Sequence, residues 1–324
     1  MLNFKGGVGK TTLSVNFAAA LANETKKSGK GYKVLLIDAD AQSNASVFML
    51  GEYWRKEIFN HPEKTLYGII DRVRKGNIKQ IDTDEIIGEF SGSGERSPVF
   101  SKEKKILADG SSEYIDSDAY WPNLHLIPSH YGLINIEKDI RYDDDGKLKI
   151  SGFGGQIRYF EILERVSSHI KEEYDFIIID CPPNLYTMSE MALYFCDNII
   201  IPVIPDWLST NGINWLIMQV KNISTKYVNH PKKVRAIAPT LWNTKELVFS
   251  RHIRILNKSL QSWKKNDMYM DLLDECEIWP GLQRFSSVNK SIESLRPIVD
   301  YSATEPARAQ LEIMIKKVIS WKNS

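Results

Sequence analysis

Residues 3–12, NFKGGVGKTT, bring together three glycines, two lysines and two threonines near the start of the chain. Glycines allow consecutive backbone N–H groups to point into one concavity, and a helix that starts just after them directs its positive end at the same anion. A lysine and a hydroxyl at the end of such a loop suit the phosphates of a nucleotide and its Mg²⁺. The residues predicted to cradle phosphates are Gly6, Gly7, Val8, Gly9, Lys10, Thr11 and Thr12.

This loop departs from the standard pattern GxxxxGK[ST]. Phe4 stands where the pattern has its first glycine, and a second lysine, Lys5, precedes Lys10. The simpler interpretation is a glycine-rich turn beside a surface lysine. We disfavour it because further parts of a phosphate site follow along the chain.

Aspartates end two apolar runs of the chain. YDFIIID ends in Asp180, and KVLLIDAD contains Asp38 and Asp40. A phosphate-binding loop needs a carboxylate on the magnesium side, at the end of a buried strand, and Asp180 fits that place. Two further carboxylates would repel a triphosphate unless they serve the metal shell or hold an attacking water. A lone aspartate that only caps a strand is the alternative interpretation.

Composition and pattern predict the fold class. The chain has 324 residues, 43% of them hydrophobic and 26% charged, with a net charge of +1, as in an ordinary globular protein. Strand-like and helix-like segments alternate from the loop onward. We therefore predict one α/β domain over residues 1–324: a doubly wound, mostly parallel sheet with helices on both faces. Residues 88–120, rich in Gly, Ser and charge, predict a surface insertion or long loop.

Several classes of protein are disfavoured. The apolar runs are far shorter than the ~20 residues that cross a membrane. The three cysteines are odd in number and lack metal-ligand spacing, so we expect a reducing, cytoplasmic setting without disulfides. They are Cys181, Cys196 and Cys276.

Seven blocks of sequence, in order and over nearly the whole chain, resemble the ParA/MinD family of deviant Walker ATPases, and among them most closely the ParA-type partition ATPases. Only the stretch at 88–120 lies outside the resemblance. The blocks are KGGVGKTT, VLLIDADAQSNAS, TLYGIIDRV, NLHLIPSHYGL, YDFIIIDCPP, IIIPVIPDWLSTNGI and RPIVDYSATEPARAQLEIMI.

The resemblance implies roles for both lysines of the loop. Lys10 would serve the ATP of its own subunit, whereas Lys5 would reach across a homodimer to the phosphates of the partner's ATP. A cation given in trans neutralises charge between two nucleotides that face each other. Dimerisation would then depend on ATP, and hydrolysis would reverse it.

The resemblance also implies roles for the other site residues. Thr11 and Asp180 would lie on the Mg²⁺ side, Asp180 acting through water, with Asp38 supporting the metal shell. Asp40 would position the attacking water, and Thr12 would lie on the α-phosphate side. Adenine contacts would come from Asn243 and the segment around Pro280.

The resemblance further implies a weak ATPase that DNA and a ParB-like partner stimulate. It would partition plasmid or chromosomal DNA on the nucleoid, and no membrane attachment is expected.

The sequence departs from the family pattern in two places. Ala41 and Ser43 replace the family's usual Pro and Gly after the second strand, while both aspartates remain. The family also has a buried strand before the loop, which Met1 and Leu2 cannot supply. Because a missing central strand would leave backbone groups of both neighbours unpaired, at ~1–3 kcal/mol for each buried group, we expect the natural chain to start further upstream.

A basic segment predicts sequence-independent DNA binding. Residues 221–265 contain eleven Lys or Arg against one acid, Glu246. Helical spacing places an apolar stripe on one face of the helix expected from about 247 to 265 and a basic stripe on the other. An ordinary solvated face is the alternative. The predicted DNA contacts are Lys232, Lys233, Arg251, Arg254, Lys258 and Lys265, opposite an apolar stripe of Phe249, Ile253, Leu256, Leu260 and Trp263.

Four alternative functions are compatible with the same phosphate-binding loop. In the first, the ATP-dependent dimer would position a protein cargo instead of DNA. A MinD-like member would carry an amphipathic membrane tail, but we expect the stripe Leu311, Met314, Ile315, Val318 and Ile319 to belong to the core. An iron–sulfur reductase would need paired cluster cysteines. A non-hydrolysing DNA-binding scaffold would bind DNA without ATP turnover.

Overall fold

The structure is a computed structural model that describes residues 1–51, 53–77, 100–106, 112–120, 123–141, 147–148, 157–225, 232–242, 247–302 and 304–322. For residues 100–106, 112–120, 140–141, 147–148 and 157 only the backbone is described.

The centre of the molecule is built from six parallel strands in two groups of three. One group has the order β4–β1–β7 and the other β10–β9–β8. Within the first group, Asp38 at the end of β1 pairs in register with Asp180 at the end of β7. The strands are β1 (Val34–Asp38), β4 (Leu124–Ile127), β7 (Phe176–Asp180), β8 (Asn198–Val203), β9 (Lys233–Pro239) and β10 (Glu277–Ile278).

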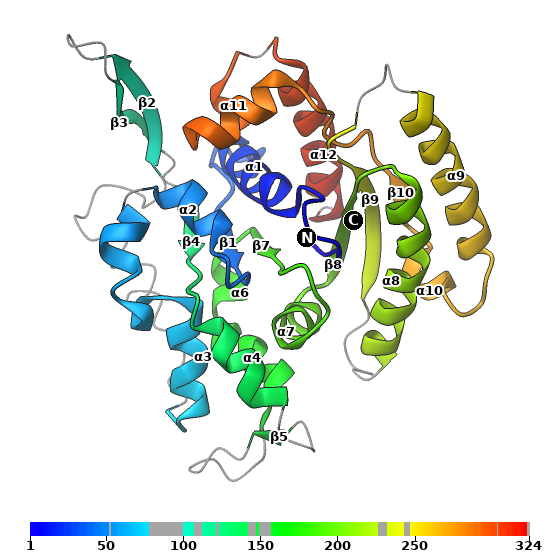
Figure 1. Ribbon diagram of the computed structural model, residues 1–324, viewed down its shortest axis with the longest axis horizontal. Coiled ribbons are helices and arrows are strands. Elements are labelled where there is room, and N and C mark those ends of the chain that lie inside the picture. The colour runs from blue at the N-terminus through cyan, green and yellow to red at the C-terminus, as the bar shows by residue number, and fades with distance from the viewer. Residues whose placement is uncertain are drawn as a thin grey trace.

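Helices cover both faces of these strands, as Figure 1 shows. Alternate residues of β1 enter two separate cores: Leu35 and Ile37 one, Val34 and Leu36 the other. This explains why the strand is apolar along its whole length, because a parallel sheet with two covered faces has no polar side. The first core is lined by α3 (Leu66–Arg74), α4 (Leu133–Arg141), α5 (Ile162–Ser167), α6 (Ile170–Glu173), α7 (Thr187–Phe195), α8 (Trp207–Thr225), α9 (Leu247–Lys264) and α10 (Met270–Leu273). The second is lined by α1 (Lys10–Asn23), α2 (Asn44–Leu50), α11 (Ser286–Ser294) and α12 (Pro306–Lys322).

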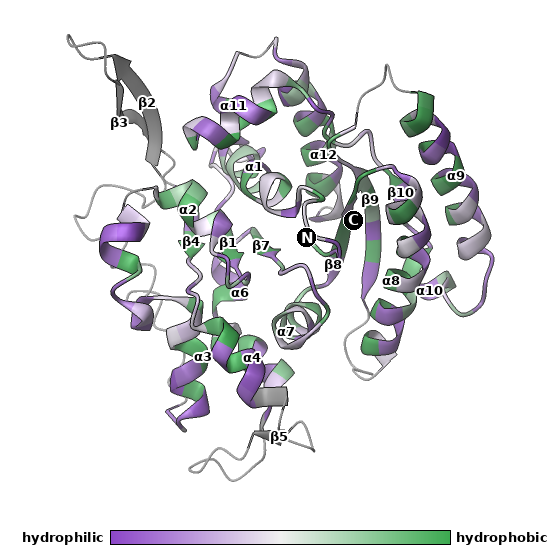
Figure 2. Cartoon of the chain, viewed as in Figure 1, coloured by the Kyte–Doolittle hydropathy of each residue, from purple (hydrophilic) through white to green (hydrophobic). Residues whose placement is uncertain are grey.

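The predicted doubly wound α/β fold is thus confirmed. Residues 159–173 do not form one continuous helix: a 3₁₀ turn at Tyr159–Glu161 is followed by α5 and then by α6. Hydrophobic and hydrophilic residues alternate along α9 (Figure 2): Leu256 and Leu260 are buried, whereas Leu247, Val248 and Ile255 are exposed together with the charged residues. Within the described part of the chain, no helix is both long and apolar enough to cross a membrane.

The segment predicted to be an insertion is described in part. β2 (Phe100–Ile106) and β3 (Ser112–Tyr120) form an antiparallel pair that projects from the body of the molecule (Figure 1). Residues 88–99 and 107–111 lie outside the described residues.

The chain before β7 is held to the C-terminal helix by Asp175. Its carboxylate accepts hydrogen bonds from Lys26, from Lys322 and from the backbone N–H of Lys33. Burial alone would raise the pKa of Asp175, but these three donors outweigh burial and lower that pKa to about 2.

We predict that Asp175→Asn lowers the free energy of unfolding at pH 7 by ~1 kcal/mol, the upper range for ion pairs near the surface. A carboxyl group with a depressed pKa stabilises the fold above its unfolded-state pKa, and that contribution disappears as the pH falls. The gap between wild type and variant should therefore close between pH 3.8 and about 2. Urea unfolding across this range measures it, with the exposed Asp267→Asn as control. A gap that stays constant with pH would contradict the assignment.

Candidate functional site

The glycine-rich loop forms the turn that the sequence predicts. Gly7 and Gly9 adopt φ angles of 70° and 76°, in the left-handed region that favours glycine, and α1 starts at Lys10 directly after them. The loop is fixed to the end of β9, because the Thr240 hydroxyl donates to the Val8 carbonyl at 2.6 Å. The open N-terminus of a 14-residue helix therefore faces the space in front of the loop.

Lys10 lies folded against its own loop. The side chain is only 6% exposed, and its Nζ donates to the Lys5 carbonyl at 3.0 Å. Burial lowers the pKa of Lys10, while the nearby carboxylates of Asp180 and Asp40 act in the opposite direction. The loop thus has a cation within reach of its own concavity.

Asp180 is fully buried beside the first turn of α1. Its Oδ1 accepts a hydrogen bond from Ser14 at 2.8 Å, and the Thr11 hydroxyl is a second donor to this carboxylate. Its Oδ2 is buried and has no partner among the described residues. A buried carboxylate oxygen without a partner, next to a helix-initiating threonine, is the donor set that a hydrated Mg²⁺ accepts.

Both carboxylate oxygens of Asp38, which lies beside Asp180, already accept hydrogen bonds. Its Oδ2 accepts both the backbone N–H and the hydroxyl of Ser46, at 2.8 and 2.7 Å, and its Oδ1 accepts the Asp40 N–H at 3.1 Å. Burial, followed by the charge of Asp180, raises the pKa of Asp38 to about 8. Asp38 therefore holds the turn that follows β1 in place.

That loop presents Asp40 at the carboxyl edge of the sheet. Asp40 is 8% exposed; its Oδ1 accepts the Gln42 N–H, and its carbonyl accepts the Ser129 hydroxyl at 2.6 Å. Ser43, where the family usually has glycine, adopts a positive φ of 55°. The turn after β1 therefore holds a non-glycine residue in the left-handed region, at the cost of some backbone strain.

Lys5 points to α8 and not into its own loop. Its Nζ donates to Asp206 Oδ2 at 3.1 Å and to the Ser209 hydroxyl at 2.7 Å. Burial would raise the pKa of Asp206, but hydrogen bonds from Ser209 and Lys5 outweigh it and lower that pKa. The Lys5 side chain stays 33% exposed, so its ammonium lies at the rim of the site.

The predicted adenine contacts are described in part. Asn243 lies outside the described residues. Pro280 follows β10, and the next residue, Gly281, packs so closely that a β-carbon there would meet the Pro239 carbonyl at 1.8 Å. Pro280 therefore lies near the end of β9, at the edge where Thr240 holds the loop. Thr12 is partly exposed in the first turn of α1.

The basic stripe of α9 faces outward as predicted. Arg251, Arg254, Lys258 and Lys265 are all exposed, and among the described residues none of the four forms an ion pair. On the opposite side Leu256 and Leu260 are buried in the first core. Three of these exposed cations lie on α9, and Lys265 directly follows its last residue.

Two other predicted DNA contacts need correction. Lys232 is 4% exposed, and its Nζ donates to the carbonyls of Tyr194 and Cys196 at the end of α7. Lys233 pairs with Asp274 at 2.6 Å. The acids that balance this part of the basic segment follow it in the chain, beyond residue 265, which is why a count over 221–265 missed them.

Sequence reasoning missed five residues that shape the site. Ser14 lies one helical turn after Lys10, and a search for polar residues at that spacing on α1 would have found it. The other four act over long sequence separations or through a turn without a distinctive pattern. They are Ser46, Thr240, Asp206 and Ser209.

The chain is similar to known proteins in sequence and in fold. The family described as "AAA domain" matches residues 1–233. An uncharacterised protein of Methanocaldococcus jannaschii is 26% identical over 317 residues, 98% of this chain and 96% of its own length. The sporulation initiation inhibitor protein Soj of Bacillus subtilis is 26% identical over 74% of this chain and 70% of its own.

A solved structure shares the fold over nearly the whole chain. It is a putative plasmid partition protein from Borrelia burgdorferi bound to AMPPNP, with a TM-score of 0.61 and 20% identity. The match covers 98% of this chain and 96% of that one.

We predict that Lys232→Met destabilises the protein by ~1–3 kcal/mol, because it removes the donor to two carbonyls at the end of α7. DNA affinity should not change. The exposed Lys258→Met is the matched control and should have the opposite profile: unchanged stability and weaker DNA binding. Thermal unfolding and fluorescence anisotropy measure the two effects, and unchanged stability of Lys232→Met would refute the buried role.

Proposed function

We propose that this chain, which belongs to the AAA-domain family matched above and is of the ParA/MinD type, is an ATP-dependent dimerising switch ATPase that binds DNA without sequence preference and partitions plasmid or chromosomal DNA. One observation carries the ATPase part: a glycine nest at a helix N-terminus lies beside a buried lysine and a buried carboxylate oxygen without a partner among the described residues. Together these groups match a nucleotide phosphate chain and its cation.

The cofactors are ATP and Mg²⁺. The N–H groups of residues 6–12 would hold the phosphates, and Lys10 would swing from the Lys5 carbonyl to the β- and γ-phosphates. Thr11 and the unpartnered oxygen of Asp180 would hold the hydrated cation, which neutralises charge on the phosphates when bound.

Asp40 is the residue that we assign to the attacking water. It is fixed at its backbone on both sides, by Asp38 and by Ser129, so that its carboxylate has a defined position at the edge of the site. Positioning of the nucleophile and neutralisation of charge are the two main contributions that a protein makes to phosphoryl transfer.

Lys5 would act in trans within a homodimer. Its contacts with Asp206 and Ser209 show that the side chain extends away from its own loop. A cation at the rim would then neutralise the phosphates of a nucleotide held by a second copy.

DNA binding would use the exposed cations of α9 and of the residue after it, which we call the basic face: Arg251, Arg254, Lys258 and Lys265. Four exposed cations without ion pairs among the described residues can neutralise backbone phosphates, and such phosphate contacts carry no sequence information. A dimer presents two such faces, so affinity should rise with dimerisation. A ParB-like partner that accelerates hydrolysis would complete the switch on the nucleoid.

The membrane-associated alternative would need an exposed apolar stripe near the C-terminal end of the chain. Leu311, Met314 and Ile315 on α12 are fully buried against the second core, and Val318 is 8% exposed. The apolar stripe at the C-terminal end therefore belongs to the core, as the sequence predicts.

We predict that Asp40→Ala lowers ATP turnover ~100-fold while leaving Mg²⁺-ATP binding intact, because it removes the group that positions water and leaves the phosphate cradle in place. Steady-state phosphate release and nucleotide titration measure the two effects. Asp267→Ala, an exposed acid outside the site, is the control. Wild-type turnover in Asp40→Ala would refute the role.

Lys5→Ala should bind nucleotide normally but fail to dimerise with ATP, since its charge is assigned to the partner's phosphates. Light scattering with and without Mg²⁺-ATP measures this, and Lys30→Ala, an exposed lysine of the turn after α1, is the control. If Lys5→Ala dimerises like the wild type, the role in trans is wrong.

The double variant Arg251→Glu with Arg254→Glu should weaken binding to all DNA duplexes alike. It should also reduce the salt slope by ~0.9 for each phosphate that the variant no longer neutralises. Lys27→Glu with Lys30→Glu makes the same change in net charge on exposed residues elsewhere and should have little effect. Equal DNA affinity in both double variants would make the basic face an ordinary solvated one.

A further inference from the structure

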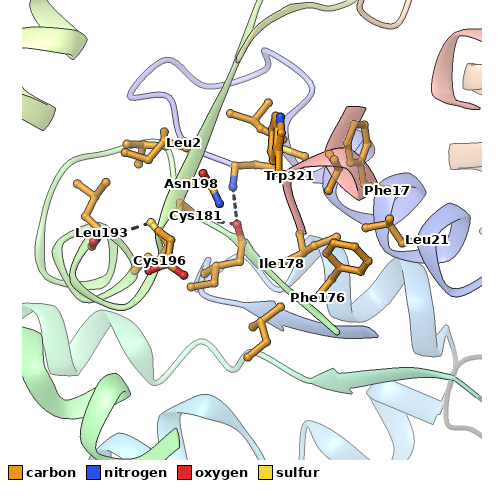
Figure 3. A pocket seen from close by; sticks show the side chains of 18 of the residues that line it. Leu2, Phe17, Leu21, Phe176, Ile178, Cys181, Leu193, Cys196, Asn198 and Trp321 are labelled. Carbon is orange, nitrogen blue, oxygen red and sulfur yellow. Dashed lines mark hydrogen bonds between the residues drawn. The ribbon is translucent and has the colours of Figure 1, made fainter. Parts of the chain in front are cut away.

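Most large apolar side chains of this protein pack inside it. Those of Phe17, Leu21 and Trp321, for example, line a cavity of about 330 Å³ beside β7 and β8 (Figure 3). The start of α9 differs, because its apolar side chains are exposed to solvent. Leu247 is 85% exposed, more than any other large apolar residue whose side chain is described, and Val248 is 60% exposed.

Leu247 lies on the same side of α9 as the cations of the basic face. It precedes Arg251 by four residues, which places it one helical turn before that cation on the same face. Arg254 and Lys258 continue this face at intervals of three and four residues. The basic face therefore begins with an apolar side chain at the first residue of the helix.

A second line of exposed apolar side chains lies next to these cations. It consists of Val248 and, two helical turns later, Ile255, which is 38% exposed. The larger part of the exposed apolar surface is contributed by Leu247 and Val248, in the first turn of α9. The exposed side of this helix thus combines an apolar end with a basic remainder.

Charge and shape indicate the kind of partner that this surface fits. Residues 247–265 contain five Lys or Arg and no acid, so the partner must be anionic. A membrane-surface helix carries apolar side chains along its whole length on the face that enters the lipid, whereas the exposed apolar residues of α9 are concentrated at one end. A DNA duplex offers phosphates outside and apolar sugar and base surfaces within its grooves.

We propose that Leu247 and Val248 form an apolar wedge that enters the minor groove of DNA and bends the duplex, while Arg251, Arg254 and Lys258 hold the phosphates beside it. This inference rests on the DNA binding proposed above and adds to it a mode of contact. Leucine side chains that enter the minor groove partly unstack a base step, and the bent duplex then contacts more of the protein surface.

The dimensions of α9 suit this arrangement. At ~1.5 Å per residue, Leu247 lies ~6 Å from Arg251 and ~16 Å from Lys258 along the helix axis. The minor groove is ~6 Å wide, so a side chain within it leaves the cations over the phosphates at its border. The wedge has no hydrogen-bonding side chain and therefore does not read base edges, in agreement with binding that is independent of sequence.

The test is the double variant Leu247→Ala with Val248→Ala, which keeps the helix because alanine is the strongest helix former. With Mg²⁺-ATP present, its affinity for a duplex should be about tenfold lower than that of the wild type, because apolar surface is no longer buried. The slope of affinity against salt should not change, since the phosphate contacts remain. Fluorescence anisotropy at several salt concentrations measures both.

Bending is measured by energy transfer between dyes at the two ends of the duplex. The wild type should bring the ends closer together, and the double variant should not. The variant Arg251→Glu with Arg254→Glu should have the opposite salt profile, with a reduced slope. The matched control, Ile292→Ala with Ile313→Ala, removes exposed apolar side chains from α11 and α12 and should behave like the wild type.

The outcomes separate this inference from the proposed function. Equal affinity and equal bending in the wild type and the Leu247 and Val248 variant would overturn the wedge and leave DNA binding by the basic face intact. With unchanged DNA affinity, loss of ATP-dependent dimerisation would assign the two residues to a second copy, and loss of binding to phosphatidylserine vesicles would assign them to a membrane. A wild-type protein that binds no duplex would refute the proposed DNA binding itself, and the wedge with it.

Discussion

Two fully buried carboxylates, Asp38 and Asp180, end adjacent parallel strands in register, and the surrounding structure is arranged to tolerate them. Burial of one unpaired carboxylate costs several kcal/mol, and two side by side cost more. The first turns of α1 and α2 supply the compensation: Ser14 donates to Asp180, and Ser46 donates twice to Asp38. The starts of both helices are therefore tied to the carboxyl edge of the sheet.

One of the four oxygens of these two carboxylates has no hydrogen-bond donor among the described residues. Both carboxylate oxygens of Asp38 accept hydrogen bonds, whereas Asp180 Oδ2 has no partner among the described residues. Burial, then the neighbouring carboxylate, raises the pKa of Asp38, because two negative charges side by side in a buried place are costly. A cation beside Asp180 would favour the charged form of both. The pair of carboxylates that costs stability is therefore the pair to which we assign the metal side of the proposed site.

Local sequence patterns were sufficient to predict the fold and the phosphate-binding loop, because glycine spacing, the start of a helix and a buried strand each depend on a few neighbouring residues. Prediction from local patterns failed where segments far apart in the sequence meet. The Lys5 contact with Asp206 spans 201 positions, and the acids Asp274 and Glu275, which neutralise Lys233 and Arg235, come from a turn beyond the basic segment. Burial of Lys232 was unpredictable for the same reason: its carbonyl partners belong to α7.

The proposed role of Lys5 in a dimer requires that its present contacts beside α8 break. To reach a second copy, its ammonium must leave Asp206 and Ser209, and both partners of the ion pair are about one third exposed. Such pairs contribute only ~0–1 kcal/mol, because water competes for both charges. Two triphosphates facing each other without water exert far stronger forces on a cation. The contact with α8 is therefore weak enough for nucleotide to displace, and it keeps the lysine at the rim where a partner's phosphates would arrive.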